Sequence, residues 1–182
     1  MEIRNNQELI NALNPVIDQV MKEMADEILD ILYDYIDSEV YDKHKPHLYD
    51  RTEEFLNSWV SSVERKGRMK EVIATIYNSP KKMRLDTENY IHGSPTSHDF
   101  RQYLAQSIEE GLGGHYWFPV KRADGSINPA AVKRPFFSET INYLKKNGKL
   151  FSLFEKKMAN HGLLLSKGNR IGEAYLSATA FM

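Results

Sequence analysis

Hydrophobic residues repeat at helical spacing along the first part of the chain. Between Asn6 and Asp37 successive apolar positions are three or four residues apart, which places them on one face of an α-helix. They are Ile10, Leu13, Ile17, Val20, Met24, Ile28, Ile31 and Tyr35. Pro15 lies inside this pattern, so it either kinks the helix or occupies the first turn of a helix that begins near Asn14. The stripe predicts a long N-terminal helix whose apolar face packs in the core or, as the alternative, forms a coiled-coil seam.

The pattern then changes to that of a β-hairpin. Trp59–Arg65 alternates loosely, Lys66-Gly67-Arg68 is a turn sequence, and Met69–Tyr77 is rich in β-branched residues. Because both faces of this second strand are apolar, we expect it to be a central strand. Before the hairpin, Val40–Asp50 reads as a loop and Arg51–Trp59 as a short helix or turn.

Helical spacing returns in the last third of the chain. A helix is expected over about Phe136–His161, with a soft spot at Asn147-Gly148 and a C-terminal stop at Gly162. A shorter helix is expected from about His98 to Glu110, ended by Gly111. The predicted fold class is α+β, a small antiparallel sheet flanked by a long N-terminal helix and a long C-terminal helix. Residues 1–40 would form the helix, residues 41–165 the α+β core domain, and residues 166–182 a C-terminal arm or tail.

Composition limits the class of protein. The 182 residues are 41% hydrophobic and 27% charged, which is ordinary for a globular protein, and the net charge of -1 does not suggest a general polyanion binder. No cysteine is present, so disulfides and thiolate chemistry are excluded. No apolar run approaches the roughly 18 residues of a membrane span, and Met1–Asn6 lacks the start of a signal peptide. We therefore expect a cytosolic protein that does not cross a membrane.

Charge is unevenly distributed between the two long helices. Eight acids lie between Asp18 and Glu39 against the single base Lys22, and seven bases lie between Tyr143 and Arg170 against the single acid Glu155. The two faces could be simply solvated, could complement each other within or between subunits, or could line a nucleic-acid channel. The candidate interface residues are Asp26, Asp30, Asp34, Lys145, Lys149 and Lys156, with Tyr175 and Phe181 in the arm.

Motifs of catalysis are weak. The chain has six histidines but no helical metal-binding motif, no nucleophile elbow and no phosphate-binding loop. We expect no catalytic residue, no metal and no cofactor. Two alternatives stay open: a metal-dependent hydrolase or nuclease that uses His92, His98 and nearby acids, and a helical adaptor that binds a partner through the acidic stripe.

Arg134-Pro135-Phe136-Phe137 stands at the entrance of the last helix. Arginine supplies a planar fork of donors, proline fixes the backbone angle φ, and the two phenylalanines supply area to bury. This composition suits docking and packing rather than chemistry.

Three segments in order resemble the neck and tail-completion proteins of long-tailed bacteriophages. The first contains Arg51-Thr52 and Asn57-Ser58-Trp59, the second is Tyr103–Gly111, and the third is Arg134-Pro135-Phe136-Phe137. Glu53 stands where the family usually has a glycine after the threonine. The resemblance implies a non-enzymatic subunit of the head-tail connector or tail terminus, assembled in the host cytoplasm and located in the virion.

The same resemblance implies a homo-oligomeric ring of six or twelve copies. Such a ring would join portal-side and connector proteins to the tail tube, and DNA would only pass through its channel. The motif residues would act in packing, and the candidate interface residues would meet neighbouring subunits.

Overall fold

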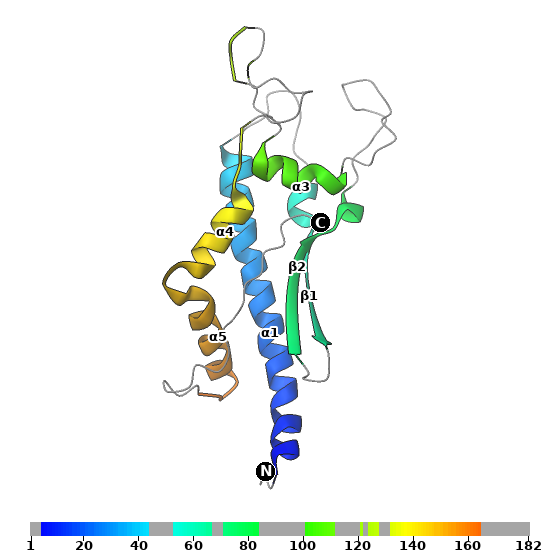
Figure 1. The fold of residues 1–182 in the computed structure, drawn as a ribbon, viewed down its shortest axis with the longest axis vertical. Coiled ribbons are helices and arrows are strands. Elements are labelled where there is room, and N and C mark those ends of the chain that lie inside the picture. The colour runs from blue at the N-terminus through cyan, green and yellow to red at the C-terminus, as the bar shows by residue number, and fades with distance from the viewer. Residues whose placement is uncertain are drawn as a thin grey trace. The chain divides into compact units, whose positions relative to one another are not determined.

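The computed structural model describes residues 5–43, 53–66, 71–83, 101–111, 121, 124–127 and 132–164. It confirms the predicted α+β class, with a two-stranded antiparallel sheet, a long N-terminal helix and a C-terminal helical region (Figure 1). The elements in chain order are α1 (Asn6–Ile36), the π-helical turn η1 (Asp37–Asp42), α2 (Glu54–Asn57), β1 (Trp59–Lys66), β2 (Glu71–Asn78), the 3₁₀ turn η2 (Pro80–Lys82), α3 (Arg101–Glu110), α4 (Phe136–Lys145), the 3₁₀ turn η6 (Lys146–Gly148) and α5 (Lys149–Asn160).

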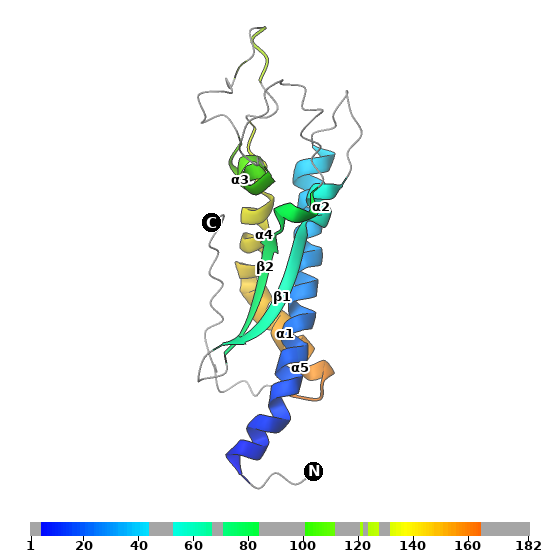
Figure 2. The same cartoon turned by 90° about the vertical axis from the view of Figure 1, so that its right-hand side faces the viewer.

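Helix α1 starts at a side-chain cap and runs through its proline. The Asn5 Oδ1 atom accepts a hydrogen bond from the Glu8 backbone N–H at 2.9 Å, and Asn5 Nδ2 donates to the Glu8 carboxylate at 3.1 Å. Pro15 lies inside the helix, so the first of the two sequence interpretations holds. Proline removes one helical hydrogen bond and crowds the preceding turn. The first turns of α1 accordingly lean away from the axis of the rest of the helix (Figure 2).

Two sequence expectations differ from what the described residues show. Val40–Asp42 continues the helix as part of η1 instead of opening a loop, because Ile36 and Val40 are both buried one turn apart. Residues 44–50 of the expected loop lie outside the described residues. Among the described strands β2 pairs with β1 alone, where the sequence predicted a central strand, and its Thr75 and Tyr77 are exposed.

The chain divides into two compact units. The first unit draws on Met1–Asp30, Ser61–Ile76 and Asn142–Ser177, and its core joins α1 to α5. Val20 and Met24 of α1 pack with Leu153 and Met158 of α5. Partly buried apolar residues surround these four: Val16, Met21, Ile28, Leu150, Phe154 and Leu163. The apolar stripe of α1 is therefore a core face over this part of its length.

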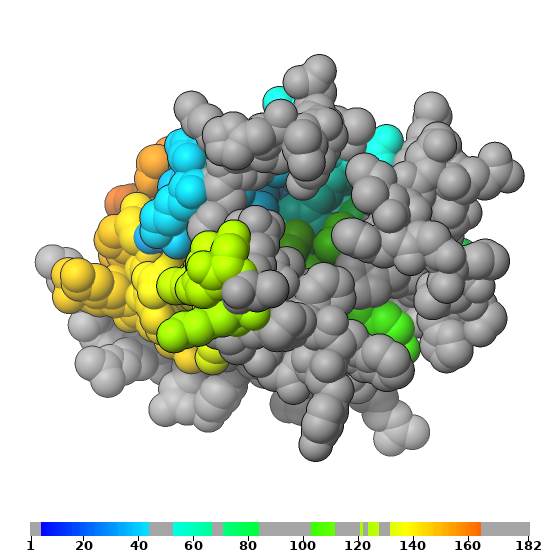
Figure 3. Space-filling model, turned by 90° about the horizontal axis from the view of Figure 1, so that it is seen from above, coloured from blue at the N-terminus to red at the C-terminus, as the bar shows by residue number. Residues whose placement is uncertain are grey.

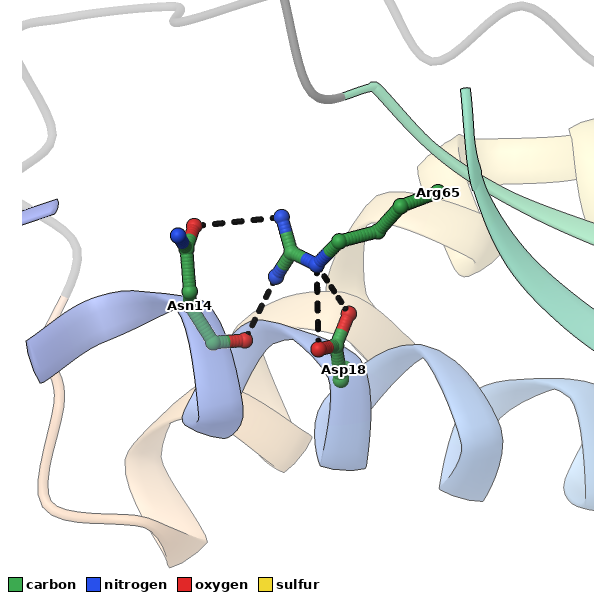
Figure 4. Close-up of polar contacts among 3 residues, drawn as sticks. All are labelled: Asn14, Asp18 and Arg65. Atoms are coloured by element: carbon green, nitrogen blue, oxygen red, sulfur yellow. Dashed lines mark hydrogen bonds and ion pairs between the residues drawn. The ribbon is translucent and has the colours of Figure 1, made fainter. Parts of the chain in front are cut away.

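Arg65 fastens the hairpin to α1 within the same unit (Figure 4). Its Nε donates to Asp18 Oδ2 at 3.0 Å, while Nη1 and Nη2 donate to the side-chain and backbone oxygens of Asn14 at 3.1 and 2.6 Å. Ser61 Oγ adds a 3.0 Å hydrogen bond to Asp26. The hairpin and α5 thus hold different sides of α1 (Figure 1).

A two-residue break separates α4 from α5, where the sequence predicted a soft spot in one helix. Asn147 and Gly148 have φ of 56° and 67°, both in the left-handed region. At its other end α5 stops at Gly162, as predicted. Gly162 N–H donates to the Ala159 carbonyl at 2.9 Å, and Leu163 N–H donates to the Met158 carbonyl at 3.0 Å. This is the Schellman arrangement, and it returns Leu163 to the core.

The second unit draws on Ile31–Val60, Tyr77–Ile141 and Ala178–Met182. Its buried apolar side chains come from α1, η1, α2, β1, α3, α4 and the residue after η2, and they include Leu32, Ile36, Val40, Phe55, Trp59, Met83, Ala105 and Phe136. Helix α3 ends at Gly111, whose φ is +74°, as the sequence predicted. Asp124 accepts hydrogen bonds from the backbone N–H and the hydroxyl of Ser126, and this turn lies at the surface (Figure 3).

Candidate functional site

The candidate site is the packing centre where α2 and the start of β1 meet the entrance of α4. Ser58 sets the geometry on the α2 side. Its hydroxyl donates to the Phe55 carbonyl and accepts from Asn78 Nδ2, both at 2.6 Å, and its carbonyl accepts from Ser79 N at 2.8 Å. Ser58 is completely buried, so each of these bonds is shielded from water. It ties the end of α2 to the end of β2 and fixes the direction of the next residue, Trp59.

Four rings form the aromatic cluster: Phe55, Trp59, Phe136 and Phe137. Phe136 meets Phe55 and Trp59 edge to face, with ring centroids 5.6 and 5.8 Å apart. Phe137 stacks on Trp59 at 6.0 Å with an interplanar angle of 22°. These are the favourable geometries of aromatic pairs. The indole N–H of Trp59 is buried without a hydrogen-bond partner among the described residues, so packing holds this ring.

Glu109 of α3 caps the N-terminus of α4. Its carboxylate accepts hydrogen bonds from the backbone N–H groups of Phe137 and Ser138 at 2.9 and 3.0 Å, and from the Ser138 hydroxyl. The first N–H groups of a helix have no partner within it, and a negative charge there is also favoured by the helix dipole. Glu109 is buried, which strengthens these bonds. The cap therefore links α3 to the first turn of α4.

Arg134 and Pro135 prepare the turn into α4. The Arg134 N–H donates to the Ile108 carbonyl at 3.1 Å, and the Arg134 carbonyl accepts from Phe136 N at 2.8 Å. Inside the first turn the Thr140 hydroxyl donates to the Phe136 carbonyl at 2.8 Å. The backbone of the motif is therefore held by α3 on one side and by its own helix on the other.

The structure brings two of the sequence motifs together. Ser58 and Trp59 lie against Phe136 and Phe137, although about eighty positions separate them in the chain. Asn57 is exposed and caps locally, with its Nδ2 donating to the Glu53 carbonyl at 3.1 Å. Arg51 and Thr52 lie outside the described residues. Glu53, at the position where the resembled family has glycine, adopts a left-handed φ of 56°.

The described candidate interface residues differ in their surroundings. Asp26 accepts a hydrogen bond from Ser61 of the same chain. The Lys149 Nζ atom lies over the Tyr143 ring, 3.3 Å from its centroid. Asp30, Asp34, Lys145 and Lys156 are exposed. Tyr175 and Phe181 fall in the C-terminal stretch that the structure does not describe.

Part of the charge complementarity between the two long helical regions lies within the first unit. Lys157 Nζ is 2.7 Å from the Glu27 carboxylate, and His161 Nε2 is 3.0 Å from that of Glu23. Hydrogen bonds from Gln19 and His161 hold the pKa of Glu23 below its ordinary value. In the second unit the Asp37 carboxyl is exposed, yet partial desolvation and the nearby acids Asp42, Glu53 and Asp34 raise its pKa.

Two residues of structural importance escaped the sequence analysis. Glu109 lies in an ordinary helical segment, and its partners are 28 and 29 positions away. Arg65 lies in a strand, 51 positions from Asn14. A strand arginine facing the polar side of a helix carries no local signal, so only the tertiary contact identifies it.

The described residues contain no group of three or more His, Cys, Asp or Glu side chains that could hold a metal ion. His92 and His98, which the enzymatic alternative needs, lie outside these residues. Within the part of the chain that is described, the helices are too short or too polar to cross a membrane.

Comparison with known proteins gives one family. No curated protein and no solved structure matches the chain. The model of the YomN family matches residues 5–160, which include both long helical regions, the hairpin and the aromatic cluster. The chain belongs to the YomN family, a phage-associated family.

Proposed function

We propose that this chain is a structural subunit of the phage head-tail connector or tail terminus. Copies form a ring that joins head-side proteins to the tail and leaves a channel for DNA, and the subunit has no catalytic activity of its own. The observation that carries the proposal is the aromatic cluster. It unites Asn57-Ser58-Trp59 with Arg134-Pro135-Phe136-Phe137, two segments that resemble neck and tail-completion proteins.

The architecture of the site suits a scaffold. Phe136 is completely buried and Trp59 nearly so, and Ser58 and Glu109 close the backbone around them. A rigid centre of this kind fixes the outward-facing parts of a subunit, and a ring requires each copy to present the same two surfaces in a constant orientation. Asp30 and Asp34 on α1 and Lys145 and Lys156 of the C-terminal helices remain exposed and are available to neighbours.

A phage defective in the gene tests the proposal. Infection without the protein should yield filled heads and separate tails, and wild-type protein added to the lysate should join them, as counted by electron microscopy and plaque titre. Phe136→Ala should join fewer, whereas Tyr77→Ala, an aromatic-to-alanine change at an exposed position of β2, should leave the count near wild type. Joined, infectious particles in the absence of the protein would refute the proposal.

The enzymatic alternative is tested by DNA cleavage with the purified protein and by complementation of the defective phage. Purified protein with Mg²⁺, Mn²⁺ or Zn²⁺ should leave single- and double-stranded DNA intact, and His92→Ala and His98→Ala should complement the defect as well as wild type does. Cleavage that both substitutions abolish would favour a nuclease instead.

A further inference from the structure

The break between α4 and α5 is a short hinge. Asn147 and Gly148 are both left-handed, a conformation that glycine adopts freely and that asparagine adopts more readily than most residues with a side chain. Both are exposed, and a Cβ added at Gly148 would meet nothing within 4 Å. An alanine at position 148 would therefore meet no steric clash, and its only cost in the bent chain is the positive φ.

The apolar pattern continues across this break. Phe137, Leu144, Phe151 and Met158 are spaced by seven residues, so one uninterrupted helix would place them along one face. In the bent chain Leu144 and Met158 are 2% and 7% exposed, but Phe151 between them is 40% exposed. The apolar spacing alone is thus compatible with a straight helix, in which Phe151 would lie between Leu144 and Met158.

The contact between α5 and α1 can form between two chains as well as within one. It consists of the apolar group Val20, Met24, Leu153 and Met158 and the two ion pairs Glu27–Lys157 and Glu23–His161. One side of this contact lies on α1, and the other side lies on α5 and the residue after it, which follow the hinge in the chain. A second copy of α1 presents the same apolar stripe and the same carboxylates to an incoming α5.

We propose that α5 is exchanged between copies of this chain. When residues 146–148 become helical, α5 leaves the α1 of its own chain and packs on the α1 of a second copy. The Glu27–Lys157 and Glu23–His161 pairs and the apolar contacts re-form between chains. The exchange keeps these contacts, removes the left-handed residues and aligns Phe151 with Leu144 and Met158, at the cost of association entropy.

The exchange rests on the proposed function, because the exchanged contact would be an interface between subunits of the ring. If each copy gives α5 to the next and receives one from the previous copy, the contact is heterologous and a ring closes. The exchange itself can be tested on isolated protein.

Cross-linking reports which chain provides α5. The chain has no cysteine, so Glu27→Cys with Lys157→Cys creates one reactive pair at a contact of 2.7 Å between the original side chains. A short bis-maleimide linker gives a one-chain product in the closed form and a ladder of linked chains in the exchanged form on a denaturing gel.

Two hinge variants provide the matched comparison. Asn147→Ala with Gly148→Ala favours the straight helix, whereas Asn147→Gly favours the bend. In the alanine variant the ladder fraction should increase several-fold and rise with protein concentration, and light scattering should show larger species. The glycine variant should stay a single-chain product. A folded alanine variant that stays monomeric with links only inside one chain would overturn the proposal.

A second measurement does not depend on the hinge variants. Chains carrying only Glu27→Cys are mixed with chains carrying only Lys157→Cys, unfolded in urea, refolded together and concentrated. Exchange predicts a two-chain product that needs both variants, and its absence in assembled protein would overturn the proposal.

The two proposals can fail separately. Particles that contain the chain, but with the 27–157 link always inside one chain, would overturn the exchange and leave the connector function standing. A ladder in purified protein, with the chain absent from particles, would overturn the connector function and leave the exchange standing.

Discussion

At the scale of single residues, Phe136 is the centre of the second unit's packing. It is completely buried and touches Phe55 and Trp59 edge to face. Loss of such a ring removes its transfer free energy and leaves a cavity that the surrounding rings cannot fill.

We expect Phe136→Ala to lower the free energy of unfolding by about 3–5 kcal/mol. Urea denaturation followed by tryptophan fluorescence measures this, because Trp59 is in the cluster. Phe151→Ala, at a position that is 40% exposed, should cost far less. Equal losses in the two variants would show that the cluster is not the stabilising centre.

Glu109 is a single-residue link between α3 and α4. Glu109→Ala should lower the free energy of unfolding by about 1–2 kcal/mol, because the Phe137 and Ser138 N–H groups lose their acceptor. Glu109→Gln keeps one acceptor oxygen and should cost less. Amide exchange of these two N–H groups should accelerate in the alanine variant. Ser138→Ala, which removes only the hydroxyl bond, is the control.

At the scale of elements, side-chain hydrogen bonds decide how the hairpin is fastened. A strand pair alone is marginally stable in water, and β1–β2 gains support from α1. Arg65 reaches two oxygens of Asn14 and the carboxylate of Asp18 with a planar fork that lysine cannot reproduce.

Arg65→Lys should therefore destabilise the first unit by about 1–2 kcal/mol although the charge is kept. Thermal unfolding measures the change, and amides of β1 and β2 should exchange faster. The neighbouring Lys66→Ala removes only an exposed pair with Glu64 and should change stability by less than about 0.5 kcal/mol. If Arg65→Lys were as mild as Lys66→Ala, the fork would have no fastening role.

At the scale of the whole molecule, two shifted carboxyl groups give stability a defined pH dependence. Glu23 has a lowered pKa in the folded protein, so the unfolded chain binds its proton first as pH falls. Its contribution is complete above the ordinary value of 4.5 and is lost as pH drops through the folded pKa. Asp37 acts in the opposite sense, because its pKa is raised and protonation favours the folded state.

Unfolding measured from pH 7 down to pH 3 should show a loss of stability below about pH 4.5 that Glu23→Gln makes shallower. Asp37→Asn should make the loss steeper, since it removes the group that gains from protonation. An unchanged slope in Glu23→Gln would contradict the role of the pair with His161 and the bond from Gln19.

Local sequence information was sufficient for most elements. Helix α1, the hairpin, the stop at Gly111 and the Gly162 cap follow from apolar spacing, β-branched composition and the conformational freedom of glycine. Their causes act within a few residues, so a pattern can show them. The break at Asn147-Gly148 was visible only as a soft spot, because an apolar pattern with seven-residue spacing continues through it.

The sequence by itself determined the α+β class, the order of the elements and the presence of a docking motif at residues 134–137. Only the tertiary structure decided what that motif meets: Phe55 and Trp59 on its apolar side and the Glu109 carboxylate at its backbone. It also decided that β2 is paired on one side alone within the described residues and that Arg65 holds the hairpin. The physical reason is that these side-chain contacts join residues 28 to 81 positions apart, so their energy depends on which faces fold together and not on any local repeat.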